Sequence, residues 1–248
     1  MEKTYLHLLF VRIKYGKNSI KGFFMNIGVI PARAGSKRFP GKNRAKFNSL
    51  ELWKIAAQKS LNTMDRTIVN TDDPEIQPGN LCERYERPPH LTDGMSYRID
   101  DVLIEMTKTL KFEHDDIICL FQPTSLFISY NTIHKIIQAF KDHNAESVQA
   151  LCKVSNTHHA FSQRVFEGDW VKFAFPHFRN RCYNSQRKPD HYVFAGFVAC
   201  RVNSLFFNNE IWGWRSVGIE VPEIESFDID TKEDLEYAQS VLTAGFAV

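Results

Sequence analysis

The chain reads Asn26-Ile-Gly-Val-Ile-Pro-Ala-Arg-Ala-Gly-Ser-Lys-Arg-Phe-Pro-Gly-Lys-Asn43 near its start, and this stretch decides the fold. It begins with a short apolar run that ends at Pro31, which is typical of a buried strand. A polar loop follows, in which Gly35 and Gly41 let the backbone turn and bring its N–H groups close to a phosphate. The loop also carries cations that can balance a triphosphate, namely Arg33, Lys37, Arg38 and Lys42. The stretch therefore predicts a strand that leads straight into a phosphate-binding loop.

Strands and helices alternate along the rest of the chain. Apolar runs predict strands at 66–70, 116–121, 147–151, 193–202 and 216–221, and helical periodicity predicts helices at 50–61, 97–111, 132–140 and 231–242. This alternation predicts an α/β fold with a mostly parallel sheet flanked by helices. Ligands bind at the carboxyl ends of the strands in such sheets. Because Thr71-Asp-Asp73 and Gln122-Pro-Thr-Ser125 directly follow strands, we expect them to share one site with the basic loop.

Composition limits the classes of protein to consider. With 248 residues, of which 43% are hydrophobic and 24% charged, the chain is expected to form one soluble globular domain. Its 31 basic and 29 acidic residues nearly balance, which argues against a nucleic-acid partner. No stretch approaches about 18 apolar residues, so no membrane span is expected. The five cysteines lack C-x-x-C spacing, which favours reduced thiols in a cytoplasmic protein.

The basic loop matches neither G-x-x-x-x-G-K-[ST] nor G-x-G-x-x-G, which argues against a P-loop NTPase and a dinucleotide-binding fold. It resembles instead the amino-terminal signature of the acylneuraminate cytidylyltransferases, I-P-A-R-x-G-S-K-x-x-P-x-K-N. Four further blocks resemble that family in the same order: Val69-Asn-Thr-Asp-Asp73, Arg87-Pro-Pro-His-Leu91 with Asp93, Gln122-Pro-Thr-Ser125, and Phe227-Asp-Ile-Asp-Thr231 with Glu233-Asp-Leu235. Together these blocks extend from residue 26 to about residue 242.

The resemblance implies a single Rossmann-like domain of the nucleotide-diphospho-sugar transferase type at 25–248, preceded by an N-terminal extension at 1–24. The aromatic and basic segment 152–190 lacks a clear match, and we interpret it as an inserted flap or dimerisation arm. The family implies an enzyme that transfers CMP from CTP to the anomeric hydroxyl of a sialic-acid-type nine-carbon keto sugar acid and releases pyrophosphate. It also implies a homodimer.

The same resemblance assigns roles to residues of the blocks. CTP would be bound by Ala32, Arg33, Ser36, Lys37, Lys42, Asn43, Arg87 and Ser96, the sugar acid by Gln122, and Mg²⁺ by Asp228 and Asp230. Arg33 and Lys37 would stabilise developing charge, and a carboxylate of the metal pair, Asp230, would take the proton of the sugar hydroxyl. Two carboxylates at i and i+2 of a strand point to the same face, so both can reach one hard cation. Thr231 and Asp234 are the expected N-cap and N3 residues of the last helix.

The chain departs from the family pattern around the expected sugar side. The family continues Q-P-T-S with P-L-R, whereas this chain reads Leu126-Phe-Ile128, and the family's N-G-A becomes Ala195-Gly-Phe197. These changes leave alternatives open: another nine-carbon acid of the legionaminic or pseudaminic type, or a catalytically impaired homologue that binds the nucleotide or the sugar. A shorter-chain acid of the Kdo type ranks lower, because that family's loop lacks the spacing from Gly35 to Asn43.

Overall fold

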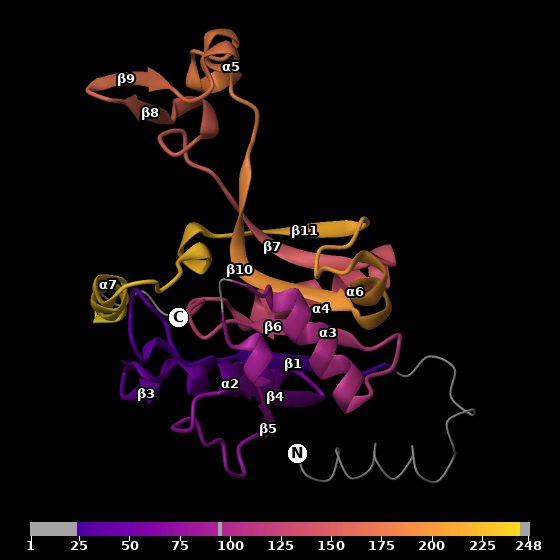
Figure 1. Cartoon of the computed structure of the whole chain (residues 1–248). Helices are drawn as coiled ribbons and strands as arrows, with labels where there is room; N and C mark the ends of the chain where they lie inside the picture. The colour runs from indigo at the N-terminus through magenta and orange to yellow at the C-terminus, as the bar shows by residue number, and fades with distance from the viewer. Residues whose placement is uncertain (1–23, 94–95, 244–248) are drawn as a thin grey trace.

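A central seven-stranded sheet organises the protein, whose computed structural model describes residues 24–93 and 96–243 (Figure 1). The strands span Asn26–Pro31 (β1), Arg66–Thr71 (β4), Glu83–Glu86 (β5), Ile117–Phe121 (β6), Ser147–Lys153 (β7), Tyr192–Arg201 (β10) and Ser216–Val221 (β11). Their order is β11-β7-β10-β6-β1-β4-β5. Within the sheet, β10 runs antiparallel to both of its neighbours and the other strands run parallel to one another. The predicted α/β fold with a mostly parallel sheet is confirmed.

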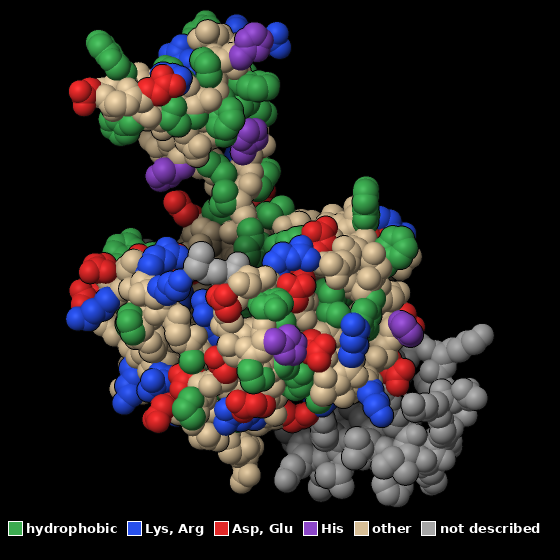
Figure 2. Space-filling model, in the orientation of Figure 1, with side chains coloured by type: hydrophobic (Ala, Val, Ile, Leu, Met, Phe, Trp, Pro, Cys, Tyr) green, Lys and Arg blue, Asp and Glu red, His purple; other side chains and the backbone are tan. Residues whose placement is uncertain are grey.

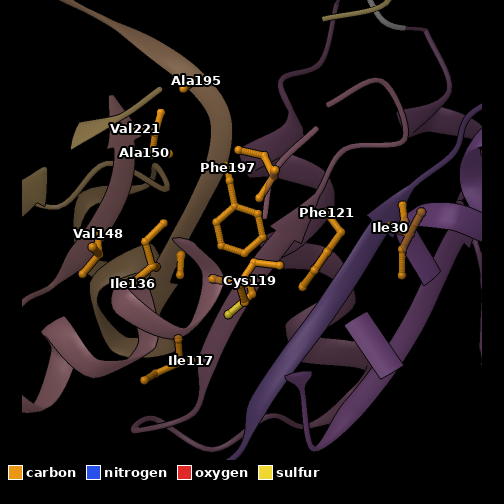
Figure 3. Packing of buried hydrophobic residues seen from close by; sticks show 14 of the residues in the cluster. Ile30, Ile117, Cys119, Phe121, Ile136, Val148, Ala150, Ala195, Phe197 and Val221 are labelled. Atoms are coloured by element: carbon orange, nitrogen blue, oxygen red, sulfur yellow. The ribbon is translucent and has the colours of Figure 1, made fainter. Parts of the chain in front are cut away.

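Helices cover both faces of the sheet (Figure 1). The α-helices of the described residues span Leu52–Thr63 (α2), Ile99–Leu110 (α3), Tyr130–His143 (α4), Pro176–Arg181 (α5), Val202–Asn208 (α6) and Lys232–Thr243 (α7). α2 and α4 pack on one face, and α3 and α6 pack on the other. Side chains of β6 alternate between the two layers, with Cys119 and Phe121 in the first and Ile118 in the second. Figure 3 shows the first layer, where the rings of Phe121 and Phe197 meet edge to face with centroids 4.9 Å apart.

The short elements are where the structure differs from the sequence prediction. α2 begins at Leu52 rather than at residue 50, because Lys46–Phe47 (β2) and Leu50–Glu51 (β3) form a small hairpin. The hairpin turns at Asn48 and Ser49, whose φ angles of 45° and 71° lie outside helical space. The sequence gives no strand prediction for β5, which is a polar edge strand, and no helix prediction for α6, which has only seven residues.

A third apolar cluster lies at the edge of the sheet where β6 ends. It unites the hairpin of β2 and β3, the loop after β6, and α7. Ile229, which is fully buried, anchors the segment before α7 in this cluster. The cluster therefore brings the end of the chain to the edge at which the basic loop leaves β1.

A separate arm rises from the sheet between β7 and β10 (Figure 1). It contains a hairpin of Arg164–Glu167 (β8) and Trp170–Phe173 (β9), followed by α5. Its surface carries aromatic side chains, among them Phe166 at 80% and Trp170 at 82% exposure, and Figure 2 shows it as a lobe apart from the body. None of the buried clusters formed by the described residues draws on residues 154–191. Of the segment that the sequence singles out at 152–190, Cys152 lies at the end of β7 in the core, and residues 154–190 lie outside the buried clusters.

All five cysteines are free thiols, and no helix in the described parts of the chain is long and apolar enough to cross a membrane. Burial raises the pKa of the Cys119 and Cys200 thiols, which lie within the sheet. These two thiols therefore stay protonated and unreactive.

Candidate active site

The ends of β1 and β4 fix the start of the basic loop. Ala32 is fully buried, and it donates its N–H to the carbonyl of Asn70 over 2.9 Å while its own carbonyl accepts the Thr71 hydroxyl over 2.6 Å. The N–H of Ala34 donates to a carboxylate oxygen of Asp72 over 2.8 Å. The basic loop and Thr71-Asp-Asp73 thus meet at one edge of the sheet, as the parallel strands predict. Because its N–H is already bonded within the protein, Ala32 supports the loop rather than presenting a donor to a ligand.

Two glycines shape the basic loop. Gly35 and Gly41 have φ angles of 73° and 71°, in the left-handed region that a Cβ atom disfavours. The buried side-chain amide of Asn43 donates to the carbonyl of Arg33 over 2.9 Å and so joins the two ends of the loop. Other predicted ligands lie at or near its surface, namely half-buried Arg33 and Ser36 and exposed Lys37. The loop therefore presents cationic and hydroxyl groups on a backbone that is held at both ends.

Asp230 reaches this loop from the other end of the chain. One of its carboxylate oxygens lies 3.1 Å from the amine of Lys42, and the other lies 2.9 Å from the guanidinium of Arg38. The next residue, Thr231, accepts the N–H of Asp234 at its hydroxyl, and the Asp234 carboxylate accepts the N–H groups of Thr231 and Asp230. This reciprocal pair confirms the predicted N-cap of α7, and it fixes the backbone beside the acidic side chain.

Asp228 and Asp230 lie on either side of buried Ile229 and have the chemistry of a magnesium site. They are not part of a strand, contrary to the sequence prediction. Ile229 donates to the carbonyl of Thr124 over 3.2 Å, but Asp230 donates to Asp234 instead, so no strand ladder continues. Burial of Ile229 still leaves Asp228 exposed and Asp230 partly exposed. The pair fits Mg²⁺, which takes one or two carboxylates together with phosphate and water oxygens, and the described residues hold no metal-suited cluster of three or more His, Cys, Asp or Glu side chains.

Arg87 is built into the same edge of the sheet. It is 5% exposed, and its Nε donates to the side-chain oxygen of Asn70 over 2.7 Å while its backbone N–H donates to the Thr71 carbonyl over 2.9 Å. Burial lowers the pKa of Arg87 to about 10, the carboxylate of Asp72 opposes this shift, and the nearby charge of Arg33 adds to it. Arg87 is therefore a buried cation beside the start of the basic loop.

The remaining predicted ligands are less closely tied to the loop. Ser96 is exposed and donates to the carboxylate of Asp93 over 2.6 Å, and no contact among the described residues joins it to the basic loop. Gln122 follows β6 and lines a small cavity of about 10 Å³. Ser125 and Gly196 line the same cavity, and Gly196 has a φ angle of 78°. The structure thus places the basic loop, Arg87 and Asp230 together, with Gln122 directly after the neighbouring strand β6.

Sequence reasoning missed residues that support the site from within. The Asn70 side chain holds Arg87, and Asp73, only 7% exposed, pairs with Arg44 over 3.0 Å. Both acceptors stand in the block Val69-Asn-Thr-Asp-Asp73, with Asn70 inside β4 and Asp73 after it. The sequence placed Asp73 at this edge but did not predict the arginine partner of either side chain. Lys59 on α2 had no such signal, because a single lysine in a helix is usually a solvated surface residue.

We compared the chain with known proteins to identify its family. A family model described as "Cytidylyltransferase" matches residues 27–171, more than half of the chain. The chain belongs to the cytidylyltransferase family.

Curated relatives of this cytidylyltransferase carry related names. The pseudaminic acid cytidylyltransferase of Campylobacter jejuni is 26% identical over 227 residues, which cover 86% of this chain and 94% of the relative. The 3-deoxy-manno-octulosonate cytidylyltransferase of Parabacteroides distasonis is 25% identical over 249 residues, covering 87% and 97%. The CMP-N,N'-diacetyllegionaminic acid synthase of Legionella pneumophila is 30% identical over 122 residues, covering 46% and 53%.

Solved structures share the fold of this cytidylyltransferase. A CMP:2-keto-3-deoxy-manno-octonic acid synthetase in complex with CTP matches with a TM-score of 0.64 at 18% identity, covering 88% of this chain and 98% of that one. A 2-C-methyl-D-erythritol 4-phosphate cytidylyltransferase from Thermus thermophilus matches with a TM-score of 0.61 at 11% identity, covering 88% and 100%. These likenesses show the fold, and family membership identifies the chain as a nucleotidyltransferase.

Proposed function

We propose that this cytidylyltransferase transfers CMP from CTP to the anomeric hydroxyl of a sialic-acid-type nine-carbon keto sugar acid and releases pyrophosphate. The observation that carries the proposal is the pairing of Asp230 with Arg38 and Lys42, because it supports a single centre for phosphate and metal. The names of the pseudaminic and legionaminic relatives support an acid of this class. A shorter acid of the 3-deoxy-manno-octulosonate type is the competing substrate, because a relative with that name aligns along most of the chain.

The nucleotide would bind along the basic loop. Backbone N–H groups and cations would surround the triphosphate, with Ser36 donating its hydroxyl. The phosphate-binding cations would be Arg33, Lys37, Arg38 and Lys42. Asn43 and Arg87, both buried at the base of the loop, would meet the cytidine side of CTP. Ser96 stays in the proposal on the family resemblance alone.

The proposed reaction is an in-line displacement at the α-phosphorus of CTP. The sugar oxygen forms a bond to phosphorus as the bond to the leaving pyrophosphate breaks, and Asp230 accepts the proton of the sugar hydroxyl. Asp228 and Asp230 would hold Mg²⁺, which when bound neutralises charge on the phosphates. Arg33 and Lys37 would stabilise the charge that develops on the phosphate oxygens. Positioning and charge neutralisation would supply most of the rate enhancement.

Gln122 is the proposed contact to the sugar acid. It stands at the carboxyl end of β6, which pairs with β1, and so lies on the strand next to the phosphate loop. Ile128 replaces the arginine of the family pattern and is 2% exposed in the core, so it offers no charge to the sugar carboxylate. This departure is the reason to test pseudaminic and legionaminic acids beside N-acetylneuraminic acid.

We further propose a cytoplasmic homodimer in which the arm packs on a second copy of the chain. Exposed apolar patches mark interaction sites, and the arm exposes Phe166, Trp170 and Tyr183. The five free thiols agree with a reducing compartment.

The direct test is pyrophosphate release from purified protein with Mg²⁺, comparing CTP with ATP, GTP and UTP. N-acetylneuraminic, legionaminic, pseudaminic and 3-deoxy-manno-octulosonic acids serve as acceptors. Release with CTP and a nine-carbon acid is expected. Release with the octulosonic acid alone would show that the acceptor is an acid of the 3-deoxy-manno-octulosonate type and not a nine-carbon acid. Binding of CTP without turnover on any acid would favour a catalytically impaired homologue. Absence of CTP binding would overturn the proposal.

A further inference from the structure

We propose that Lys59 is a positioning residue, whose amine fixes the loop from Gln122 to Ser129 and thereby sets the affinity for the sugar acid. This inference rests on the proposed function, because Gln122 is the residue assigned there to the sugar. Lys59 belongs to α2 and does not itself reach the basic loop in any described contact.

The amine of Lys59 binds two carbonyl groups of this loop. Its Nζ donates to the carbonyl of Leu126 over 2.6 Å and to that of Ile128 over 2.7 Å. Neither carbonyl accepts another hydrogen bond among the described contacts. A buried carbonyl without a donor is costly, so the lysine stabilises a loop conformation that would otherwise leave two acceptors unpaired.

A carboxylate holds the far end of the same loop. Glu225, in the short 3-10 helix Glu223–Ser226 (η5), is 7% exposed and accepts the N–H of Ser129 over 3.2 Å. The Thr124 carbonyl within the loop accepts the N–H of Ile229, which stands between the two proposed metal ligands. The loop therefore connects the sugar contact to the metal pair, and Lys59 supports it from beneath.

A small cavity joins Lys59 to Gln122. Both residues line it, together with Ser125 and Gly196, and its volume of about 10 Å³ is at the lower limit of what one ordered water needs. The Ser125 hydroxyl is buried there without a hydrogen-bond partner. Two of the three N–H groups of the Lys59 ammonium are used by the carbonyls, so the third and the Ser125 hydroxyl suit one ordered water. Such a water would link the Lys59 ammonium by hydrogen bonds to the part of the loop that carries Gln122.

Charge on the amine strengthens this support. Burial lowers the pKa of Lys59 to about 8, and the carboxylate of Glu225, the charged group that faces it, opposes the shift. The polar side chains that share the cavity, Gln122 and Ser125, are uncharged. At neutral pH the amine is mostly protonated and makes charge-assisted hydrogen bonds, which are about twice as strong as neutral ones.

The test compares two variants of Lys59. Lys59→Met removes the hydrogen-bond donors, and Lys59→Gln keeps a neutral N–H donor. Lys59→Gln also serves as the second variant if Lys59→Met fails to fold. Lys54→Met is the matched control, because Lys54 is on the same helix but pairs at the surface with Glu51. We expect Lys59→Met to raise the KM for the sugar acid about tenfold or more while the Kd for CTP stays within about twofold. Lys59→Gln should raise this KM by less than Lys59→Met, because it keeps an N–H donor. Equal weakening of CTP and sugar binding, or an unchanged KM for the sugar acid, would overturn the inference.

Hydrogen exchange supplies a readout that needs no turnover. The amide of Ser129 should lose protection in Lys59→Met and keep it in Lys54→Met, measured without ligands. Unchanged protection contradicts the positioning role even if no acid proves to be a substrate. If the wild type turns over no acid while protection is lost as expected, the proposed function fails and the role of Lys59 in holding the loop stands.

Discussion

Asp230 pairs with two cations of the basic loop, and we assign to it both metal binding and the proton transfer. Replacing Asp230 with Asn keeps its size but removes the charge that pairs with Arg38 and Lys42. These ion pairs are partly exposed, so the free energy of unfolding should fall by no more than about 1 kcal/mol. Pyrophosphate release should fall about 100-fold or more, because a charged group at the reacting centre is lost. Glu236→Gln on the exposed face of α7 is the control. Full turnover in Asp230→Asn would remove both roles assigned to this carboxylate.

Two features require glycine at position 196: its positive φ angle and the close approach of Ser125. Its φ angle is 78°, and a Cβ atom there would lie 2.1 Å from the Ser125 hydroxyl oxygen. Gly196→Ala should therefore lower the free energy of unfolding by about 1–3 kcal/mol, measured by urea denaturation. Gly79→Ala is the matched control, because Gly79 also has a positive φ, of 56°, but a Cβ there meets nothing within 4 Å. Similar losses in the two variants would mean that backbone strain alone accounts for the effect.

Lys59 should make stability rise with pH. Its pKa falls from 10.5 to about 8 in the folded protein, mainly through burial. Between these values the unfolded chain binds more protons than the folded one, so the free energy of unfolding increases with pH across this window. This contribution is fully present above pH 10.5 and is lost as the pH falls through about 8. Urea titrations between about pH 7 and 10 should show a steeper rise for the wild type than for Lys59→Met, and parallel slopes would contradict the shifted pKa.

Among the elements, α7 is capped at its first turn by the same hydrogen bonds that hold the backbone of Asp230. The Asp234 carboxylate accepts hydrogen bonds from the backbones of Thr231 and Asp230 and from the Thr231 hydroxyl. Asp234→Ala should cost about 1 kcal/mol of stability, which is typical of a lost cap, and should also weaken the Mg²⁺ dependence because Asp230 loses its backbone anchor. Thermal unfolding and magnesium titration of turnover measure the two effects. If stability falls while the magnesium titration is unchanged, the cap serves the helix alone.

The elements also mark how far the sequence predicts this fold. Apolar runs placed the main strands to within about two residues, because buried parallel strands have little polar content, whereas polar β5 gave no periodic signal. The alternation of strands and loops anticipated that the basic loop, Thr71-Asp-Asp73 and Gln122-Pro-Thr-Ser125 share one edge. It did not predict that Asp230 binds Arg38 and Lys42, because a contact across so much sequence depends on the packing of α7. Lys59 was unpredictable for the same reason, since only the folded loop gives its amine two carbonyl partners.

For the molecule as a whole, the proposed dimer contact lies on the arm, and the proposed nucleotide site lies on the body. Lys153 and Tyr192 are cross-strand partners at the base of the arm, so an Asn-Gly turn can join them and replace residues 154–191. The body should still fold, because its buried clusters draw on none of the arm residues described. We expect the shortened protein to be a monomer by light scattering and to bind CTP within about twofold of the wild type by calorimetry, since the basic loop is unchanged. A Phe166→Ser/Trp170→Ser variant keeps the arm, loses its exposed aromatic surface, and should also be monomeric. A monomeric wild type, or a dimer that survives removal of the arm, would show that the arm is not the contact between subunits.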